Sequence, residues 1–398
     1  MIALALALQS AGHAVLLAGP PEKAVWIRKT GCAFHPLGSD VTAFIDRMQN
    51  AHSIRAAAGF VSFLRTEINA QFDLLPDLIS GVDLVLGASL VFSLSSIAEA
   101  MGIDYRYIAF TPQLLPSAHH PFLAFKHQGF PGWMNRMGWH MAAGLDKLNI
   151  TRLLNRQRRR FGLAPLKDAW AHILGQNVIV ASDVEIAGVP PDAAVSCVQT
   201  GYMHLAQPPR RLPELEAFLN AGPPPLYAGF GSMPQPDQAK LVPVIVEAAR
   251  ENGLRVIVAK FWDEPSPFSA AEDVFFIRKY PHRDLFPRVA AVIHHGGAGT
   301  TATTAISGVP QIIVPHVLDQ YYWGHRIFKA GLGPKPIWRV RLTAARLARA
   351  IENTVTRREW TDNAAAVGEK LRRKDALATA VREIEGGGCE KGFYGSRV

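Results

Sequence analysis

Residues 291–301 read AVIHHGGAGTT, and this stretch decides the fold of the second half of the chain. Residues 291–295 form a short apolar run typical of a buried strand, which the glycines at 296 and 297 bring to an end. The residues from 298 onward then open a helix. A short strand, a tight glycine turn and a helix are the repeating unit of a doubly wound α/β sheet.

Short apolar runs alternate with helical segments on both sides of this stretch. In the second half the predicted strands are residues 226–230, 255–259, 274–277, 291–295 and 311–315. In the first half they are residues 13–18, 31–37, 83–87, 105–110 and 177–181. Near-continuous apolar strands separated by helices indicate parallel sheets that are covered on both faces.

A proline-rich polar segment separates the two halves. Residues 206–213 read AQPPRRLP and residues 221–225 read AGPPP, a composition typical of domain boundaries. We therefore predict a first domain over residues 1–205, a linker over 206–222 and a second domain over 223–398. Two doubly wound domains leave a cleft between them, and we expect the functional site in this cleft.

The glycine turn after the strand 291–295 has the features of an anion site. Such a turn points backbone N–H groups and the positive end of a helix dipole at one place. Glycine lets the backbone approach a phosphate closely, although tight packing alone also explains glycines here. Thr300 can add a hydroxyl and His295 a ring N–H donor, which strengthens the prediction of a bound phosphate.

Other polar residues follow the ends of neighbouring strands. Asp319 and Gln320 come after the strand 311–315, and a carboxylate beside an amide suits vicinal sugar hydroxyls. Asp319 is equally well explained as a helix N-cap. Ser232 opens a loop after the strand 226–230. The segment 280–282, which ends in His282, is either an edge for a nucleobase or plain core.

The composition excludes several classes of protein. Hydrophobic residues make up 48% of the chain and charged residues 19%, as in ordinary globular proteins. The three cysteines are far apart and no HExxH or D-x-D motif occurs, so neither a disulfide framework nor a metal site is expected. No apolar run approaches about 20 residues, and the opening lacks the features of a signal peptide. We therefore expect a cytoplasmic protein.

The formal net charge of +9 is concentrated in two basic runs, residues 156–160 and 372–374. Such runs are most often solvated helix faces. The functional alternative is attraction to anionic lipid headgroups or to an acidic acceptor, which would mean a peripheral contact with a membrane. Nucleic acid is not an expected partner, because no aromatic-interleaved basic motif accompanies the charge.

The segment from residue 111 to about residue 174 interrupts the regular alternation. It begins with an irregular stretch rich in proline, histidine and aromatic residues, and a long helical stretch follows. Such an insertion suits the wall of an acceptor pocket, but it could equally be a surface loop packed by its own side chains. The aromatic residues in question are Phe122, Phe125, Phe130, Trp133 and Trp139.

The motifs together resemble one enzyme family. HHGGAGTT at 294–301, GVP at 308–310 and DQYYWGHR at 319–326 look like the donor-binding signature of family-one glycosyltransferases. The resemblance is greatest to the branch of bacterial and fungal sterol glucosyltransferases and of glycopeptide and macrolide antibiotic glycosyltransferases. AGHAVLLAGPPE at 11–22 and YPHRDLFPRVAAVIHHGG at 280–297 resemble the same branch, so the likeness covers nearly the whole chain.

The resemblance implies a GT-B fold, in which two Rossmann-like domains bind the acceptor (1–205) and the nucleotide-sugar donor (223–398). It implies transfer with inversion, without a bound metal and without a cofactor other than a UDP- or dTDP-linked donor. The donor-binding residues would be Ser232, His282, His295, Gly297, Ala298, Gly299, Thr300, Asp319 and Gln320. His295 and the 297–300 turn would meet the diphosphate, Asp319 and Gln320 the sugar, and Ser232 and His282 the nucleoside.

One departure from the family pattern concerns the start of the chain. The family begins with a strand and a glycine-rich loop that supplies the general base, whereas Met1 lies inside what resembles the first helix. We therefore expect a hole in the first sheet with unpaired backbone groups, and a start that lies upstream, a fragment or a degenerate copy. The catalytic base stays unassigned, with His119 and His120 as the first candidates to mutate.

Two functions follow from the sequence. The first is transfer of a hexose to a small, hydrophobic acceptor such as a sterol, a lipid or a polyketide. The alternative is a catalytically inactive protein that binds nucleotide sugars or serves as a scaffold, because the residues that would supply the base are not evident.

Overall fold

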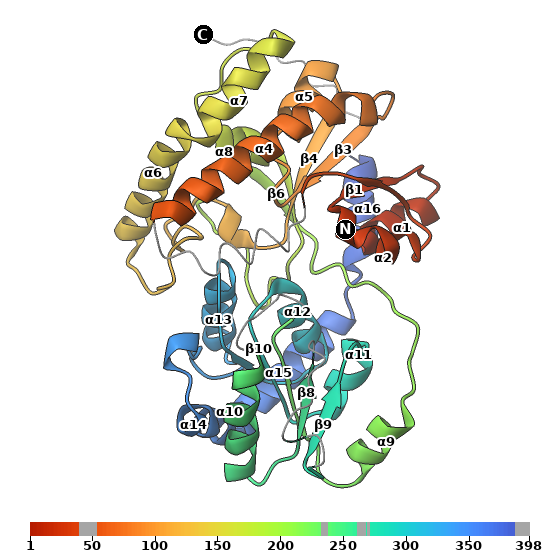
Figure 1. Ribbon diagram of the computed structural model, residues 1–398, viewed down its shortest axis with the longest axis vertical. Coiled ribbons are helices and arrows are strands. Elements are labelled where there is room, and N and C mark those ends of the chain that lie inside the picture. The colour runs from red at the N-terminus through yellow and green to blue at the C-terminus, as the bar shows by residue number, and fades with distance from the viewer. Residues whose placement is uncertain (40–53, 232–237, 261–267, 269–270, 387–398) are drawn as a thin grey trace.

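The computed structural model describes residues 1–39, 54–231, 238–260, 268 and 271–386. The chain forms two α/β halves, which lie one above the other in Figure 1. The strands predicted from the apolar runs are all present, each within three residues of its expected start and end. An additional strand at 196–199 was not predicted, because its residues SCVQ carry little apolar signal.

The helices and strands alternate along the chain. The strands are β1 (Leu16–Gly19), β2 (Ala33–Pro36), β3 (Leu84–Ala88), β4 (Asp104–Ala109), β5 (Asn177–Val180), β6 (Ser196–Gln199), β7 (Leu226–Gly229), β8 (Val256–Ala259), β9 (Val274–Ile277), β10 (Ala291–His294) and β11 (Gln311–Ile313). The helices are α1 (Ile2–Ser10), α2 (Ala24–Arg28), α4 (Ile54–Leu78), α5 (Leu94–Met101), α6 (Gly132–Leu148), α7 (Ile150–Arg158), α8 (Ala169–Leu174), α9 (Pro213–Asn220), α10 (Gln238–Glu251), α11 (His282–Leu285), α12 (Ala298–Ile306), α13 (Gln320–Lys329), α14 (Ala344–Thr356), α15 (Arg358–Arg372) and α16 (Ala376–Gly386). Short 3-10 turns are η1 (Pro21–Lys23), η2 (Pro112–Leu114), η3 (Arg159–Phe161), η4 (Phe286–Arg288) and η5 (Arg339–Arg341).

The second half is a five-stranded parallel sheet in the order β11-β10-β7-β8-β9. Alternate residues of β7 pack into hydrophobic cores on opposite faces of the sheet. Leu226 and Ala228 pack with α10 and α14, whereas Tyr227 packs with α9 and α11 on the other face. Burial on both faces explains why these strands are continuous apolar runs rather than alternating ones.

The sheet of the first half is divided. Strands β3-β4-β5-β6 form a four-stranded parallel sheet, and β1 and β2 form a separate parallel pair. Side chains of α4, α5, α7 and α8 cover one face of the larger sheet, and α1 and α16 cover the other. Both sheets are parallel and covered by helices, as predicted.

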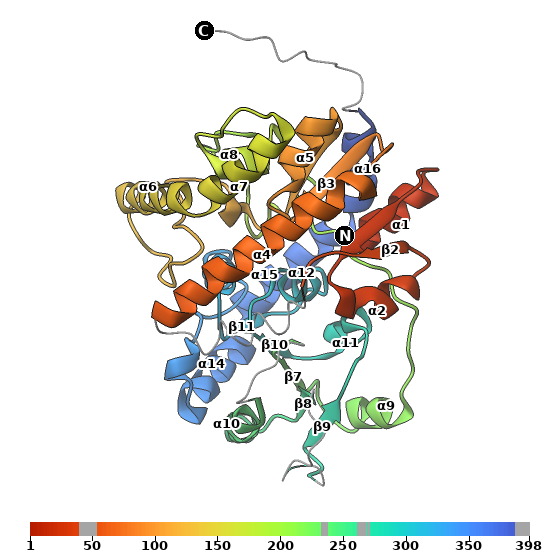
Figure 2. The same ribbon diagram turned by 45° about the horizontal axis from the view of Figure 1, so that its top comes forward.

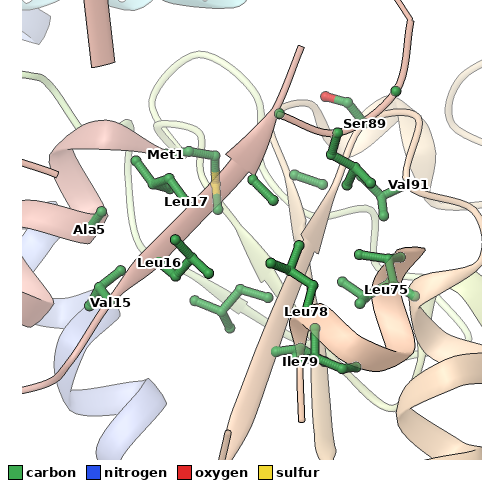
Figure 3. Close-up of a pocket in the computed structure, with 18 of the residues that line it drawn as sticks. Met1, Ala5, Val15, Leu16, Leu17, Leu75, Leu78, Ile79, Ser89 and Val91 are labelled. Carbon is green, nitrogen blue, oxygen red and sulfur yellow. The ribbon is translucent and has the colours of Figure 1, made fainter. Parts of the chain in front are cut away.

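A cavity of about 800 Å³ separates β1 from β3. Figure 3 shows Met1, Leu16 and Leu17 on one side of this cavity and Leu78 and Ile79 on the other. Among the described strands β1 pairs only with β2 and β3 only with β4, so both strand edges that border the cavity lack a partner. This is the hole that the sequence predicts in the first sheet.

Filling this hole is expected to stabilise the first half. Joining a five-residue segment rich in valine and isoleucine ahead of Met1 should pair backbone groups of β1 and β3, each worth about 0.5–1.5 kcal/mol net. At roughly 2–4 °C per kcal/mol, the melting temperature should rise by about 5–10 °C. Thermal unfolding followed by circular dichroism measures this. A matched segment with two prolines should have no effect, and equal melting temperatures for both variants would contradict the prediction.

The last helix crosses from the second half to the first. Helix α16 packs against α1, where Leu4 and Leu8 share a core with Ala380 and Ile384. In Figures 1 and 2, α16 lies beside α1 near the N-terminus, far from α14. The segment 223–398 therefore includes a helix that covers the sheet of the other half.

The two halves also meet through side chains near the carboxyl ends of their strands. Ile186 of the first half shares a core with Tyr322 and Trp323 of α13. Arg326 Nε donates to the carbonyl of Ile186 at 3.0 Å. These contacts fix how the first half faces the carboxyl edge of the second sheet.

Candidate functional site

The candidate site lies where the strand order of the second sheet reverses. The chain runs outward from β7 through β8 to β9, then returns to β10 on the other side of β7. His294 at the end of β10 is directly opposite Gly229 at the end of β7. The loops after these two strands therefore diverge at the carboxyl edge, where open α/β sheets bind ligands.

The turn after β10 requires glycine at position 296. Gly296 has a φ of +86°, in the left-handed region that side chains disfavour. A Cβ on Gly296 would also lie 2.8 Å from Cγ2 of Ile313 and 3.0 Å from the carbonyl oxygen of Gln320. The turn is thus pressed against the start of α13, which brings the two predicted parts of the donor site together.

His294 stabilises this turn through hydrogen bonds. The side chain is fully buried, and its Nε2 lies 2.9 Å from Oε1 of Gln311. Its Nδ1 accepts a hydrogen bond from the backbone N–H of Gly296 at 3.1 Å. Burial lowers the pKa of His294 to about 3, so the ring is neutral and keeps this acceptor at neutral pH.

The N-terminus of α12 is free of side-chain capping. Its N-cap residue is Gly297, which has no side chain to offer, and its first turn contains no acidic residue. Ala298, Gly299 and Thr300 form this first turn and are each half-buried. Uncapped N–H groups at the positive end of a helix are a ready site for an anion.

His295 lies between the two strand ends. Its ring packs against Gly231, where a Cβ would be 3.1 Å from Cε1, and a Cβ on Gly297 would overlap its Nε2. Nδ1 is buried without a hydrogen-bond partner among the described residues. Burial lowers the pKa of His295 to about 4, although an interaction with the backbone of Gly229 opposes this shift, so at neutral pH the uncharged ring carries one N–H.

Asp319 and Gln320 lie at the start of α13, and each already has a partner inside the protein. Gln320 Oε1 accepts from the backbone N–H groups of His316 and Val317 at 2.8 and 3.1 Å. Asp319 Oδ2 accepts from Trp323 Nε1 at 3.1 Å. Each side chain therefore has one remaining polar atom, a carboxylate oxygen or an amide nitrogen, to offer to a ligand.

The loop before Asp319 is strained and buried in part. Leu318 has a φ of +49°, which is uncommon for a residue with a branched side chain. Burial raises the pKa of Asp319 to about 6. A carboxyl group held by a strained loop and withdrawn from water is typical of a binding site rather than of a simple helix cap.

The structure adds His316, which the sequence reasoning missed. Its ring stacks on Phe230 with centroids 5.5 Å apart, and both ring nitrogens are buried without a partner among the described residues. Burial lowers its pKa to about 3, with contributions from Arg339 and His295. The signal available in the sequence was its position directly after the strand that precedes Asp319.

His282 is committed to the core beside the site. Its Nε2 lies 3.0 Å from the hydroxyl of Tyr227, and its ring stacks on Phe286 with centroids 4.5 Å apart. It therefore lies behind the carboxyl end of β7 as part of the packing. Ser232 lies outside the described residues.

The first half supplies the opposite wall of the site. A Cβ on Gly299 of α12 would lie 2.8 Å from the hydroxyl of Tyr202, so this tyrosine closely approaches the predicted anion site. The backbone N–H of Tyr202 donates to Asp183 Oδ1 at 3.0 Å, and its ring lies beside His204. Burial raises the pKa of both Asp183 and Tyr202.

The two histidines considered as bases have different surroundings. His120 is buried between Trp139 and Tyr322, and burial lowers its pKa to about 4. His119 is exposed, and its backbone N–H donates to the hydroxyl of Ser117. His119 is thus the one of the two that a substrate could reach without a change in packing.

Within the described residues no group of three or more histidine, cysteine, aspartate or glutamate side chains could hold a metal ion. No helix in the same part of the chain is long and apolar enough to cross a membrane.

Comparison with known sequences extends over most of the chain. Residues 253–383 match the family model of the erythromycin biosynthesis protein CIII-like C-terminal domain. The chain is 34% identical to vancomycin aglycone glucosyltransferase of Amycolatopsis orientalis over 84% of this chain and 81% of that protein. It is 29% identical to a sterol 3-beta-glucosyltransferase of Arabidopsis thaliana over 96% of this chain and 64% of that protein.

Solved structures share the architecture at lower sequence identity. Spinosyn forosaminyltransferase SpnP has a TM-score of 0.70 and 18% identity, with 98% of this chain and 95% of that chain covered. Glycosyltransferase VinC, solved in complex with dTDP, has a TM-score of 0.68 and 20% identity, with 97% and 94% covered. The two-domain arrangement is therefore shared with these proteins.

Proposed function

From the premise that the chain belongs to the GT-B glycosyltransferase family that includes vancomycin aglycone glucosyltransferase, we propose that it transfers a hexose from a UDP- or dTDP-sugar to a small hydrophobic acceptor. The acceptor oxygen forms a bond to the anomeric carbon while the bond from that carbon to the diphosphate oxygen breaks. The nucleoside diphosphate leaves with the electron pair, and a base takes the hydroxyl proton. Attack opposite the leaving group inverts the anomeric centre.

One observation carries this proposal: the uncapped start of α12 and the ring of His295 converge at the strand reversal. Negative charge develops on the diphosphate as it leaves. Preorganised N–H donors and a helix dipole stabilise such charge in a site that excludes water. In this proposal the remaining carboxylate oxygen of Asp319 and the amide nitrogen of Gln320, at the start of α13, bind the sugar hydroxyls.

A hydrophobic acceptor is proposed from the character of the first half. Two of the relatives are named for a glycopeptide aglycone and for sterols. In the segment after residue 111, Phe122 packs edge-on against Trp139 and Phe125 against Phe130. These rings form an apolar wall that also contacts His120 through Trp139, on the side facing α13.

Transfer without a bound metal is part of the proposal and is directly testable. Incubating the protein with UDP- and dTDP-hexoses and a panel of sterol, polyketide and hydrophilic aglycones should give a glycoside detectable by mass spectrometry. EDTA should leave the rate unchanged, because helix and histidine N–H donors neutralise the diphosphate. Strict dependence on a divalent cation would contradict metal independence, and preference for free sugars would contradict a hydrophobic acceptor.

The second candidate is a protein that binds the donor without turning it over. It is favoured by the enclosure of His120 between Trp139 and Tyr322, which keeps this candidate base from a substrate. Calorimetry with UDP and dTDP distinguishes the two functions. Nucleotide binding without transfer to any aglycone would support a catalytically inactive protein. Loss of transfer in a His119→Ala variant with intact nucleotide binding would support the enzyme.

The proposal includes a cytoplasmic location and a peripheral contact with a membrane, where hydrophobic acceptors concentrate.

A further inference from the structure

Helix α6 carries a stripe of large apolar side chains on its exposed side. Trp133, Met137, Met141, Leu145 and Leu148 are between 48% and 72% exposed. They follow one another at intervals of four, four, four and three residues. This spacing places all five on one face of the helix, which we call the α6 stripe.

The opposite face of α6 is held firmly in the first half. Asn135, Gly138, Trp139 and Ala142 are buried. Asn135 Nδ2 donates to the carbonyl of Ala118 at 2.8 Å, and Trp139 Nε1 donates to the carbonyl of His120 at 3.2 Å. The α6 stripe is therefore presented by a helix with its own packed core contacts, and substituting the stripe should not unfold it.

Basic side chains flank the stripe on one side. Arg136, His140 and Lys147 are exposed and lie on the same flank of α6, because 136, 140 and 147 also share a helical face. The neighbouring helix α7 adds exposed Arg152 and Arg156. The one acidic residue of α6, Asp146, is half-buried.

These basic groups are available to a partner. Within the described part of the chain, no carboxylate forms an ion pair with Arg136, Arg152 or Arg156, whereas Arg160 pairs with Asp73. Helix α6 lies at the left edge of the upper half in both Figure 1 and Figure 2. An exposed apolar patch of this kind marks an interaction site.

Charge and shape together select the kind of partner. A helix with a broad apolar face and a lysine- and arginine-rich flank lies in the plane of a bilayer interface, with its apolar side about 5–10 Å below the headgroups. Tryptophan side chains favour this depth of the bilayer, and Trp133 at the start of the stripe would lie there. Anionic headgroups attract the basic flank.

We propose that the α6 stripe and its basic flank dock the protein on an anionic lipid surface. The docked helix lies parallel to the membrane, and the first half contacts the bilayer while the second half projects away. This proposal specifies the surface for the peripheral membrane contact named under the proposed function. It rests on that function in one respect, namely that a bilayer would concentrate hydrophobic acceptors.

Vesicle sedimentation with the full chain tests the docking. The protein should sediment with vesicles of phosphatidylcholine and phosphatidylglycerol, and much less with phosphatidylcholine alone or at high salt. Met137→Glu, Met141→Glu and Leu145→Glu together should lower the partition coefficient at least about tenfold. Val25→Glu with Val340→Glu is the matched control, because these valines are also exposed but belong to α2 and η5 rather than to the α6 stripe.

Other results would overturn the proposal. These are equal partitioning of the triple variant and the control, absence of binding to both vesicle compositions, or a wild-type dimer that the triple variant dissociates in light scattering. The last result would assign the face to a second copy of the chain. Transfer to a water-soluble aglycone without vesicles should be unchanged in the triple variant. Vesicle binding without any transfer would refute the proposed function alone.

Discussion

Replacing His295 with alanine is expected to lower the turnover number for transfer by about 10²–10³-fold, the usual effect of removing one donor to developing charge. The ring of His295 packs between Gly231 and Gly297, beside the uncapped start of α12. Its neutral N–H would be lost where the diphosphate departs. Donor binding should weaken less than turnover falls, because the contact strengthens in the transition state.

His294→Ala is the matched comparison for this variant. His294 forms hydrogen bonds with Gln311 and with the backbone N–H of Gly296, so its loss leaves buried polar groups without partners. This should cost about 1–3 kcal/mol of stability for each unsatisfied group. Steady-state kinetics and denaturant unfolding of both variants separate the roles. If His295→Ala lost stability and kept its turnover, the proposed contact with the diphosphate would be wrong.

Acidification from pH 7 to pH 4 is expected to unfold the protein, with a midpoint at about pH 5. Burial lowers the pKa of seven histidines to about 3 or 4 from the ordinary value of 6.5. They are His120, His172, His204, His282, His294, His295 and His316. His172 has a second cause, since Arg158 lies 3.3 Å from its Nε2.

The direction of the effect follows from proton binding. Well above pH 6.5 these histidines are neutral in both states and contribute no pH dependence. Between pH 6.5 and about 4 the unfolded chain binds protons that the folded chain refuses, so stability falls with pH. Each unit of pKa difference is worth about 1.36 kcal/mol, and a whole domain is stable by only about 5–15 kcal/mol.

Buried carboxyl groups oppose this trend but do not reverse it. Burial raises the pKa of Asp146 and Asp319 to about 6, which stabilises the folded state as pH falls through that range. Two aspartates shifted by about two units offset only a fraction of seven histidines shifted by two to three units each. The net effect is loss of stability in acid.

Circular dichroism and tryptophan fluorescence between pH 8 and pH 3.5 measure this midpoint. His172→Gln should move it to lower pH, because glutamine accepts from Arg158 and does not titrate. His140→Gln, at an exposed position on α6, is the control and should leave the midpoint unchanged. Retention of native signals at pH 4 in the wild type would contradict the prediction.

The sequence by itself determined the α/β class and the position of the predicted anion site. Strands such as 226–229 and 291–294 are buried on both faces, so their apolar runs are continuous and readable. The turn after β10 depends on the positive φ of Gly296, a backbone geometry that favours glycine, and that requirement is local. Local signals also predicted the strand–helix alternation on both sides, whereas the open position in the first sheet was predicted from the resemblance to the glycosyltransferase family.

The tertiary structure alone decided which polar atoms lack a partner inside the protein and which helix faces stay exposed to solvent. Gln320 is an amide in the sequence, but packing commits its oxygen to the 316–317 backbone, and His316 becomes a buried ring without partners. Helix α16 leaves the second half to cover β4 and β5, and the loop around Ala118 covers only one side of α6. These outcomes depend on contacts between segments far apart in the chain, whose energies no local pattern records.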